Sequence, residues 1–146
     1  MQIDNEALVM VVDGAKMLLF RNKGDGTYPK LEVEEALAQQ DEATREQGSS
    51  PPGRNAAPGG SRRGSFEQTD YHQQSEDRFA ADAAAMLNKR ALANDFEKLI
   101  IVAPPTTLGE LRKHYHKALQ SRLAGEISKD LASHPVPEIE RIISGS

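Results

Sequence analysis

The stretch Leu99–Pro105, "LIIVAPP", is an unbroken apolar run rich in β-branched residues that ends in two prolines. A run of this length and composition is typical of a strand that is buried on both faces of a sheet. Proline has no backbone N–H for a strand ladder, so the pair Pro104-Pro105 ends the strand at once. We therefore predict a central strand over 99–103.

Three further strands are predicted in the first part of the chain. The apolar runs 7–12 and 15–21 flank Asp13-Gly14, a dipeptide that favours a tight hairpin turn with positive φ at both turn positions. A third strand is predicted over Tyr28–Val33, and Pro29 places it at a sheet edge. Together these runs predict an antiparallel three-stranded meander.

Helices and one more strand are predicted around and after the central strand. Ser75 caps a helix to about Ala93, with an apolar stripe of Phe79, Ala83, Met86, Leu87 and Leu92. Thr107 and Glu110 form a capping box that opens a second helix. Residues 122–128 alternate as a strand with Leu123, Gly125 and Ile127 on one side, and a last helix ends near Ile143.

The predicted order is β-β-β-α-β-α-β-α over one domain, residues 1–146. Helical crossovers imply parallel pairing, so we expect an α/β fold whose mixed sheet has the ribonuclease-H-like order. Residues 42–74 interrupt it: they are rich in Gly, Pro, Ser, Gln, Asn and Arg, with few apolar anchors. We expect a long flexible or disordered loop there, before the first helix.

The amino-acid composition argues against several classes of function. The chain has no cysteine, four histidines and a net charge of −4, so we expect no metal site and no cofactor. The acidic balance argues against strong nonspecific nucleic-acid binding, although local basic patches remain. No apolar run reaches membrane-spanning length and the N-terminus does not resemble an export signal, so we expect a cytoplasmic protein without membrane contact.

Two sets of basic residues are candidates for RNA binding. Arg54, Arg62 and Arg63 lie in the predicted loop, where a guanidinium would contact phosphates; solvated loop charge is the alternative. Arg112, Lys113 and Lys117 lie on the exposed face of the second predicted helix and would suit RNA or an acidic protein.

A ligand pocket is a second, weaker candidate. Pro104, Pro105, Thr106 and Thr107 lie between a strand end and a helix start, where α/β folds bind anions, and Asp13 ends a neighbouring strand. Helix capping alone also explains Thr107, and turn chemistry explains Asp13 better than a nuclease acid does. No nucleophile with a base, carboxylate pair or phosphate loop is found, so no catalytic residue is assigned.

Three segments carry a family resemblance: "VMVVDGAKMLLFRNKGD" (9–25), "LIIVAPPTTLGELRKHYHKAL" (99–119) and "GEISKDLASHPVPEIE" (125–140). They resemble the bacterial host attachment protein family, also described as protein required for attachment to host cells. That family is distantly similar to the central domain of archaeal and eukaryotic class 1 peptide-chain release factors.

The resemblance implies a functional loop. In release factors the corresponding loop has a Gly-Gly-Gln tip that enters the ribosomal peptidyl-transferase centre and positions water for hydrolysis of peptidyl-tRNA. The matching residues here are Gly59, Gly60 and Ser61, followed by Arg62 and Arg63. Ser61 is shorter than glutamine and lacks its amide, and this departure from the motif argues against hydrolysis by the release-factor mechanism.

These observations lead to one main hypothesis and two alternatives. The first is a non-enzymatic module that binds the ribosome or structured RNA through the Gly/Arg-rich loop and the basic helix face. The second is an indirect contribution to host attachment through a protein partner. The third is a residual peptidyl- or aminoacyl-tRNA ester hydrolase that uses Ser61 or a backbone amide of the loop to place water. The oligomeric state stays open.

Overall fold

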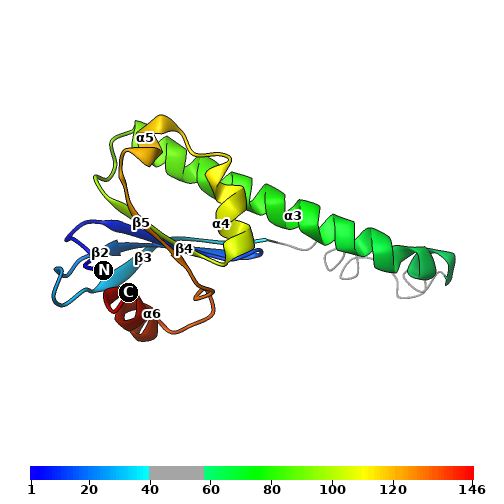
Figure 1. Cartoon of the computed structure of the whole chain (residues 1–146), viewed down its shortest axis with the longest axis horizontal. Helices are drawn as coiled ribbons and strands as arrows, with labels where there is room; N and C mark the ends of the chain where they lie inside the picture. Colours follow the sequence, from blue (N-terminus) through cyan, green and yellow to red (C-terminus); the bar gives the residue numbers. More distant parts are fainter. Residues whose placement is uncertain (40–57) are drawn as a thin grey trace.

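The computed structural model describes the backbone of residues 1–39 and 58–146, and the side chains of residues 1–39 and 73–146. Within these residues a five-stranded sheet has the order β3-β2-β1-β4-β5 (Figure 1). The pairs β1·β2 and β2·β3 are antiparallel, and β1·β4 and β4·β5 are parallel. This confirms the predicted α/β class and mixed sheet. The strands are Leu8–Val12 (β1), Lys16–Asn22 (β2), Leu31–Ala38 (β3), Leu99–Ala103 (β4) and Leu123–Ser128 (β5).

Helices cover both faces of the sheet. Three helices lie over one face and α6 lies over the other (Figure 1). The helices are Pro58–Leu92 (α3), Pro105–Arg112 (α4), Lys117–Gln120 (α5) and Val136–Ser144 (α6). Every residue of β1 and β4 is buried, because successive side chains enter two separate apolar clusters. The predicted two-sided burial of 99–103 is confirmed, although β1 occupies the middle of the strand order.

Strand β5 does not keep the predicted alternation. Leu99 pairs with Leu123, but Ile100 pairs with Gly125, so Ala124 is an extra residue at a bulge. A single extra residue moves all later side chains to the other face. Leu123 accordingly packs on the cluster beneath α3, whereas Ile127 joins the cluster beneath α6. The prediction that Leu123, Gly125 and Ile127 share one side is therefore wrong.

The hairpin between β1 and β2 forms as predicted, but its turn differs. Neither Asp13 nor Gly14 has a positive φ. Instead, the Asp13 carboxylate accepts hydrogen bonds from the backbone N–H groups of Ala15 (2.9 Å) and Lys16 (2.8 Å). This side-chain cap replaces the left-handed geometry that Asp-Gly usually indicates. A β-carbon at Gly14 would lie 2.7 Å from Cδ of Glu76 in α3, but the exposed Glu76 side chain can rotate away, so the turn does not require glycine there.

The third strand begins later than predicted. Strand β3 is at the sheet edge, as expected, but it starts at Leu31, and Tyr28–Lys30 belong to the preceding turn. Asp25 Oδ1 accepts from the backbone N–H of Thr27 and Tyr28, and Asn22 Oδ1 accepts from that of Lys30. These side chains hold the backbone of 27–30 in a turn. Tyr28 is left 79% exposed.

Helix α3 begins at Pro58 rather than at the predicted Ser75. Residues 58–74 of the predicted loop are thus helical, and residues 42–57 lie outside the described residues. The apolar stripe indicated only the part that packs on the sheet, whereas a helix propagates beyond it through local backbone hydrogen bonds. Phe79, Ala83 and Leu87 are buried as predicted, but Leu92 at the helix end is 63% exposed.

The predicted second helix is two helices without a capping box. Helix α4 starts after Pro104 with no side-chain cap, because Pro105 already has a helical φ and needs no N–H. The helix ends at Arg112, and Asn88 of α3 then holds the connection: it donates to the carbonyl of His114 (2.8 Å) and accepts from the N–H of His116 (3.0 Å). His116 Nδ1 caps α5 by accepting from Ala118 N–H.

Replacing either of two glycines by alanine is expected to change the stability in opposite directions. A β-carbon at Gly109, in α4, would meet no atom within 4 Å, so Gly109→Ala is expected to stabilise the protein by about 0.5–1 kcal/mol. A β-carbon at Gly24 would overlap the carbonyl oxygen of Tyr28 and lie 2.8 Å from the nitrogen of Lys30. Gly24→Ala should therefore destabilise it, by about 2 kcal/mol. Urea unfolding of both variants checks the signs; equal signs would contradict the described packing.

Candidate functional site

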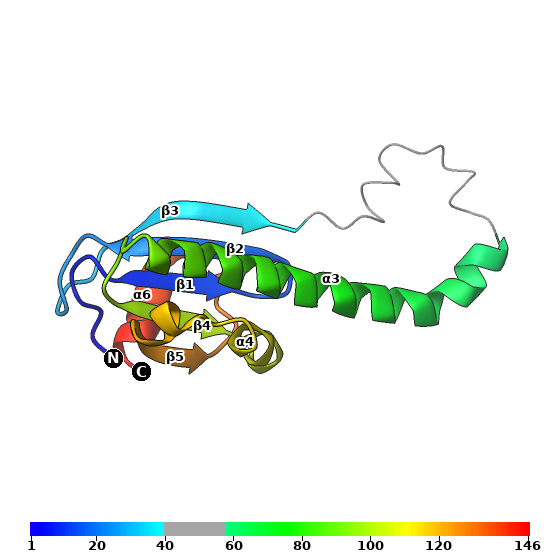
Figure 2. The same cartoon turned by 90° about the horizontal axis from the view of Figure 1, so that it is seen from above.

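The far end of α3 is the most prominent feature of the molecule. The helix has 35 residues, which at about 1.5 Å per residue makes it about 50 Å long. Among the side chains that the structure describes in this helix, from residue 73 on, the first buried one is Phe79. Residues 58–78 lie before Phe79 in the helix, a length of about 30 Å, and Figure 2 shows α3 extending past the end of the sheet. Gly59–Arg63, here termed the helix tip, lies in the first two turns; Arg54 lies outside the described residues.

The second basic set, Arg112, Lys113 and Lys117, is exposed on α4 and α5 and in the residues between them. Arg112 Nη2 lies 2.7 Å from Glu126 Oε1, and Lys113 Nζ lies 2.9 Å from Glu110 Oε2. These hydrogen bonds raise the pKa of both cations. Within the described residues Lys117 pairs with no carboxylate. Of the three cations, two are thus already paired with carboxylates, so the set has less free positive charge than the sequence indicates.

The predicted ligand residues lie together at the carboxyl end of the two parallel strands β1 and β4. Asp13 follows β1 and Pro104–Thr107 follow β4, its neighbour in the sheet. The Asp13 carboxylate is already occupied by two backbone N–H groups, and Pro105 and Thr106 are exposed. A ligand at this edge stays a prediction.

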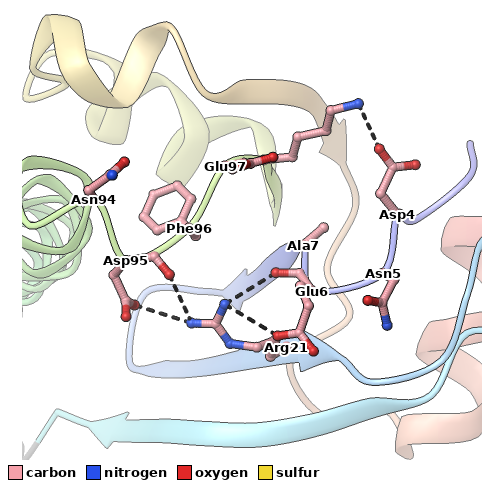
Figure 3. A pocket seen from close by; sticks show the side chains of 10 residues that line it. Asp4, Asn5, Glu6, Ala7, Arg21, Asn94, Asp95, Phe96 and Glu97 are labelled. Atoms are coloured by element: carbon pink, nitrogen blue, oxygen red, sulfur yellow. Dashed lines mark hydrogen bonds and ion pairs between the residues drawn. The ribbon is translucent and has the colours of Figure 1, made fainter.

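A pocket of about 430 Å³ lies at the opposite end of these two strands, next to their amino ends, and is here termed the amino-edge pocket. Residues 4–7 before β1 face residues 94–98 before β4, with Arg21 of β2 at the base (Figure 3). The two segments are adjacent because β1 and β4 are parallel neighbours. The pocket is lined by Asp4, Asn5, Glu6, Ala7, Arg21, Asn94, Asp95, Phe96, Glu97 and Lys98.

An ion-pair network positions Arg21, whose side chain is only 11% exposed. Its Nε donates to Glu34 Oε2 (2.7 Å), and its Nη2 donates to Asp95 Oδ2 (3.2 Å). Nη1 donates to the carbonyl of Glu6 (3.2 Å). The hydrogen bond to Arg21 lowers the pKa of Glu34, and the same bond raises the pKa of Arg21. Arg21 and Glu34 therefore both stay charged at neutral pH.

A bulge in β3 makes this network possible. Leu19 pairs with Glu35 and Phe20 pairs with Val33, so Glu34 is an extra residue in the strand. Consecutive strand residues ordinarily point to opposite faces. The bulge instead lets Glu34 and Glu35 both reach Arg90 of α3, at 2.9 and 3.1 Å. The network thus ties the edge strand to the end of the long helix.

The pocket walls also hold unusual backbone conformations. Among the described residues, the non-glycine positions with positive φ are Glu6 (69°) and Asn94 (59°), and both line the amino-edge pocket. Asparagine adopts this conformation readily, whereas for glutamate it is uncommon. Such residues persist where surrounding contacts hold them, and they cluster at functional sites.

Comparison with protein families bears on the chain as a whole. The model of bacterial archaeo-eukaryotic release factor family 12 matches residues 6–143. The chain belongs to this family. The predicted release-factor relationship is confirmed, and the resemblance to the host attachment family stays a prediction. Comparison with curated proteins found no match.

The family 12 match includes both the helix tip and nearly all of the amino-edge pocket. In the described part of the chain, no helix is long and apolar enough to cross a membrane. Nor does the described part bring three or more His, Asp or Glu side chains together as metal ligands. The candidate sites are therefore a projecting helix end and a polar pocket.

Sequence reasoning missed the amino-edge pocket. Its residues come from positions 4–7, 21 and 94–98, which no local pattern connects. The one available signal was the polar pair Arg21-Asn22 at the end of an apolar strand, where both side chains are buried. Buried polar side chains need partners, so such a pair indicates a network even before the partners are known.

Proposed function

We propose that this family 12 protein is a non-enzymatic module that binds the ribosome or another structured RNA through the helix tip. The observation that best supports this is the projection of α3 past the sheet in a chain with release-factor ancestry. The helix end lies about 30 Å along the helix from Phe79, so it can reach into a crevice that the sheet itself does not fit. The family match makes ribosome association the natural context.

The residues of the tip suit close approach to a phosphate backbone. Gly59 and Gly60 have no side chains, so the backbone can come near RNA. Arg62 and Arg63 add two guanidinium groups, each a rigid fork of donors that matches phosphate oxygens. The amino end of a helix also attracts negative charge through its macrodipole. Arg54, earlier in the chain, would add a further phosphate contact.

Two observations favour binding over hydrolysis. Ser61 occupies the place of the release-factor glutamine and lacks the amide that would position water. The tip also lies far from the polar groups of the packed body, so no base from that part of the chain assists it. Catalysis of ester hydrolysis needs such preorganised groups.

The basic set Arg112, Lys113 and Lys117 would make a secondary contact. Because Arg112 and Lys113 already have carboxylate partners, RNA phosphates must compete with Glu126 and Glu110. We therefore expect this set to contribute less to affinity than the tip arginines.

Cosedimentation with bacterial ribosomes over a salt series tests the proposal. Wild type is expected to bind saturably and more weakly as salt rises. Replacing Arg54, Arg62 and Arg63 together by alanine should lower the affinity at least tenfold, and should reduce the slope of log K against log salt by about 2. The corresponding triple variant of Arg112, Lys113 and Lys117 should show a smaller loss.

The control removes the same charge elsewhere. Lys16, Lys30 and Arg141 are exposed cations away from the tip, and their triple alanine variant lowers the net charge equally. It should bind nearly as wild type does. If the control and the tip variant lose affinity equally, binding depends on net charge and not on the helix tip. Either that result or absence of binding at low salt would overturn the proposal.

The two alternative functions have less support than RNA binding. An indirect role in host attachment through a protein partner rests on the resemblance to that family alone. Hydrolysis of an aminoacyl or peptidyl ester would use Ser61 or a backbone amide of the loop to place water. Absence of peptidyl-tRNA hydrolysis by the wild-type protein on ribosomes would therefore exclude it, and unchanged rates in Ser61→Ala would exclude the Ser61 route.

A further inference from the structure

The amino-edge pocket has the size of a small-molecule site. Its volume of about 430 Å³ lies within the usual range for ligand pockets, and the proposed RNA contact does not use it. Its walls are fixed from several directions. Asn5 donates to the carbonyl of Gly24 (2.7 Å), and Arg122 donates to the carbonyl of Phe96 and lies 5.8 Å from its ring centroid.

The cations of the pocket are already satisfied. Arg21 is surrounded by Glu34, Asp95 and the carbonyl of Glu6. Lys98 Nζ lies 2.6 Å from Asp4 Oδ2. An anionic ligand would have to displace a carboxylate from one of these cations. The pocket therefore does not suit phosphates or carboxylates.

The remaining hydrogen-bonding capacity is mostly that of acceptors. Within the described residues, the side chains of Glu97 and Asn94 form no hydrogen bond and no ion pair. Asn5 uses its Nδ2, which leaves its side-chain oxygen as an acceptor. Of the four carboxylates in the lining, three already pair with cations: Asp4 with Lys98, Glu6 with Lys23, and Asp95 with Arg21 and Arg90. Within the described residues Glu97 pairs with none, so the pocket has one carboxylate left for a ligand. A complementary ligand is therefore a positively charged donor.

The pocket also has an apolar part. Phe96 and Ala7 belong to its lining, and because each is only 4% exposed, they offer a ligand a small apolar surface next to the acceptors. An ammonium or guanidinium group on a short alkyl chain combines the donor and the apolar stem that this lining requires. A bare metal ion fits less well, since the described residues provide no cluster of three or more metal-ligating side chains.

We propose that the amino-edge pocket binds a small organic cation with an alkyl ammonium or guanidinium group, which Glu97, Asn94 and Asn5 hold from opposite walls. The same chemistry occurs in a free diamine and in a lysine side chain of a protein segment. The proposal is independent of the proposed RNA binding, because the pocket lies at the opposite edge of the sheet from the projecting end of α3 (Figure 2).

Titration of the whole ¹⁵N-labelled protein followed by NMR tests the proposal. Cadaverine is the free cation, and acetyl-Gly-Lys-Gly-amide presents the same group on a peptide. We expect a Kd of about 1 mM or tighter for one of them, with amide shifts centred on residues 4–7 and 94–98. Tighter binding of cadaverine indicates a free cation, and tighter binding of the peptide indicates a protein segment.

Matched ligands and variants make the result decisive. Pentane-1,5-diol and glutarate have the same chain length without the positive charge, and neither should shift these amides. Glu97→Gln, and Asn94→Gly, which tolerates the positive φ, should each weaken binding about tenfold, and neither should change the fold. Glu32→Gln on β3, outside the pocket, should bind as wild type does. Absent shifts, equal shifts with the diol, or equal losses in Glu32→Gln would overturn the proposal.

Discussion

Replacement of Asn22 by alanine is expected to lower the free energy of unfolding by about 3 kcal/mol. Asn22 is fully buried at the end of β2. Its Nδ2 donates to the carbonyls of Ile3 (2.7 Å) and Asp4 (3.2 Å), and its Oδ1 accepts from the N–H groups of Gly24 (2.9 Å) and Lys30 (2.8 Å). Alanine would leave these backbone groups without partners, and buried unpaired groups lose their hydration without compensation. Urea unfolding followed by circular dichroism measures the loss.

Asn5→Ala is the matched control for Asn22. Asn5 is exposed and donates one hydrogen bond, to the carbonyl of Gly24 in the same turn. Its removal should cost less than about 1 kcal/mol, because water replaces the lost donor. Asn22→Asp adds a second test: the new carboxylate would face carbonyl oxygens, so this variant should regain stability as the pH falls toward about 4. Equal losses for Asn5→Ala and Asn22→Ala would show that Asn22 does not organise the turn.

Arg21→Ala is expected to destabilise the protein by about 2–3 kcal/mol, and Arg90→Ala by about 1 kcal/mol. The difference follows from burial, since the Arg21 side chain is 11% exposed and that of Arg90 is 20% exposed. The expected loss of stability for Arg21→Ala is smaller than the loss that usually follows when a fully buried ion pair is broken. Its partners Glu34 and Asp95 are 29% and 40% exposed, so water screens them.

The double variant is the sharper measurement. Both arginines contact Glu34 and Asp95, so each one still neutralises these acids when the other is removed. Removal of both leaves two carboxylates close together without a cation. The loss in the double variant should therefore exceed the sum of the single losses by about 1 kcal/mol. Additive losses of stability would mean that the two arginines do not neutralise the same acids. Adding Glu34→Gln to the double variant should recover part of the non-additive loss.

The strands of the core could be predicted because their signal is local. Residues 8–12 and 99–103 are continuous apolar runs, and each is buried along its whole length in the structure. Parallel pairing of these strands followed from the helices between them. The last helix was also predictable, since Val136–Ser144 follows a proline and buries Ile139 and Ile143 in a regular stripe.

The candidate sites were predictable only in part. The basic residues of the helix tip can be recognised in the sequence, but their presentation at the end of a long helix cannot, because the polar part of α3 has no apolar stripe to indicate it. Similarly, Arg112 and Lys113 look like free cations until the fold brings Glu126 of β5 and Glu110 of α4 beside them.

By itself, then, the sequence determined the α/β class, the interior strands, the strand directions and the position of β3 at an edge. Those features depend on hydrophobicity and turn residues that act over a few positions. Tertiary structure alone decided the bulges at Glu34 and Ala124, the late start of β3, and the assembly of the amino-edge pocket. These depend on pairing between distant segments, where one extra residue in a strand decides which side chains meet.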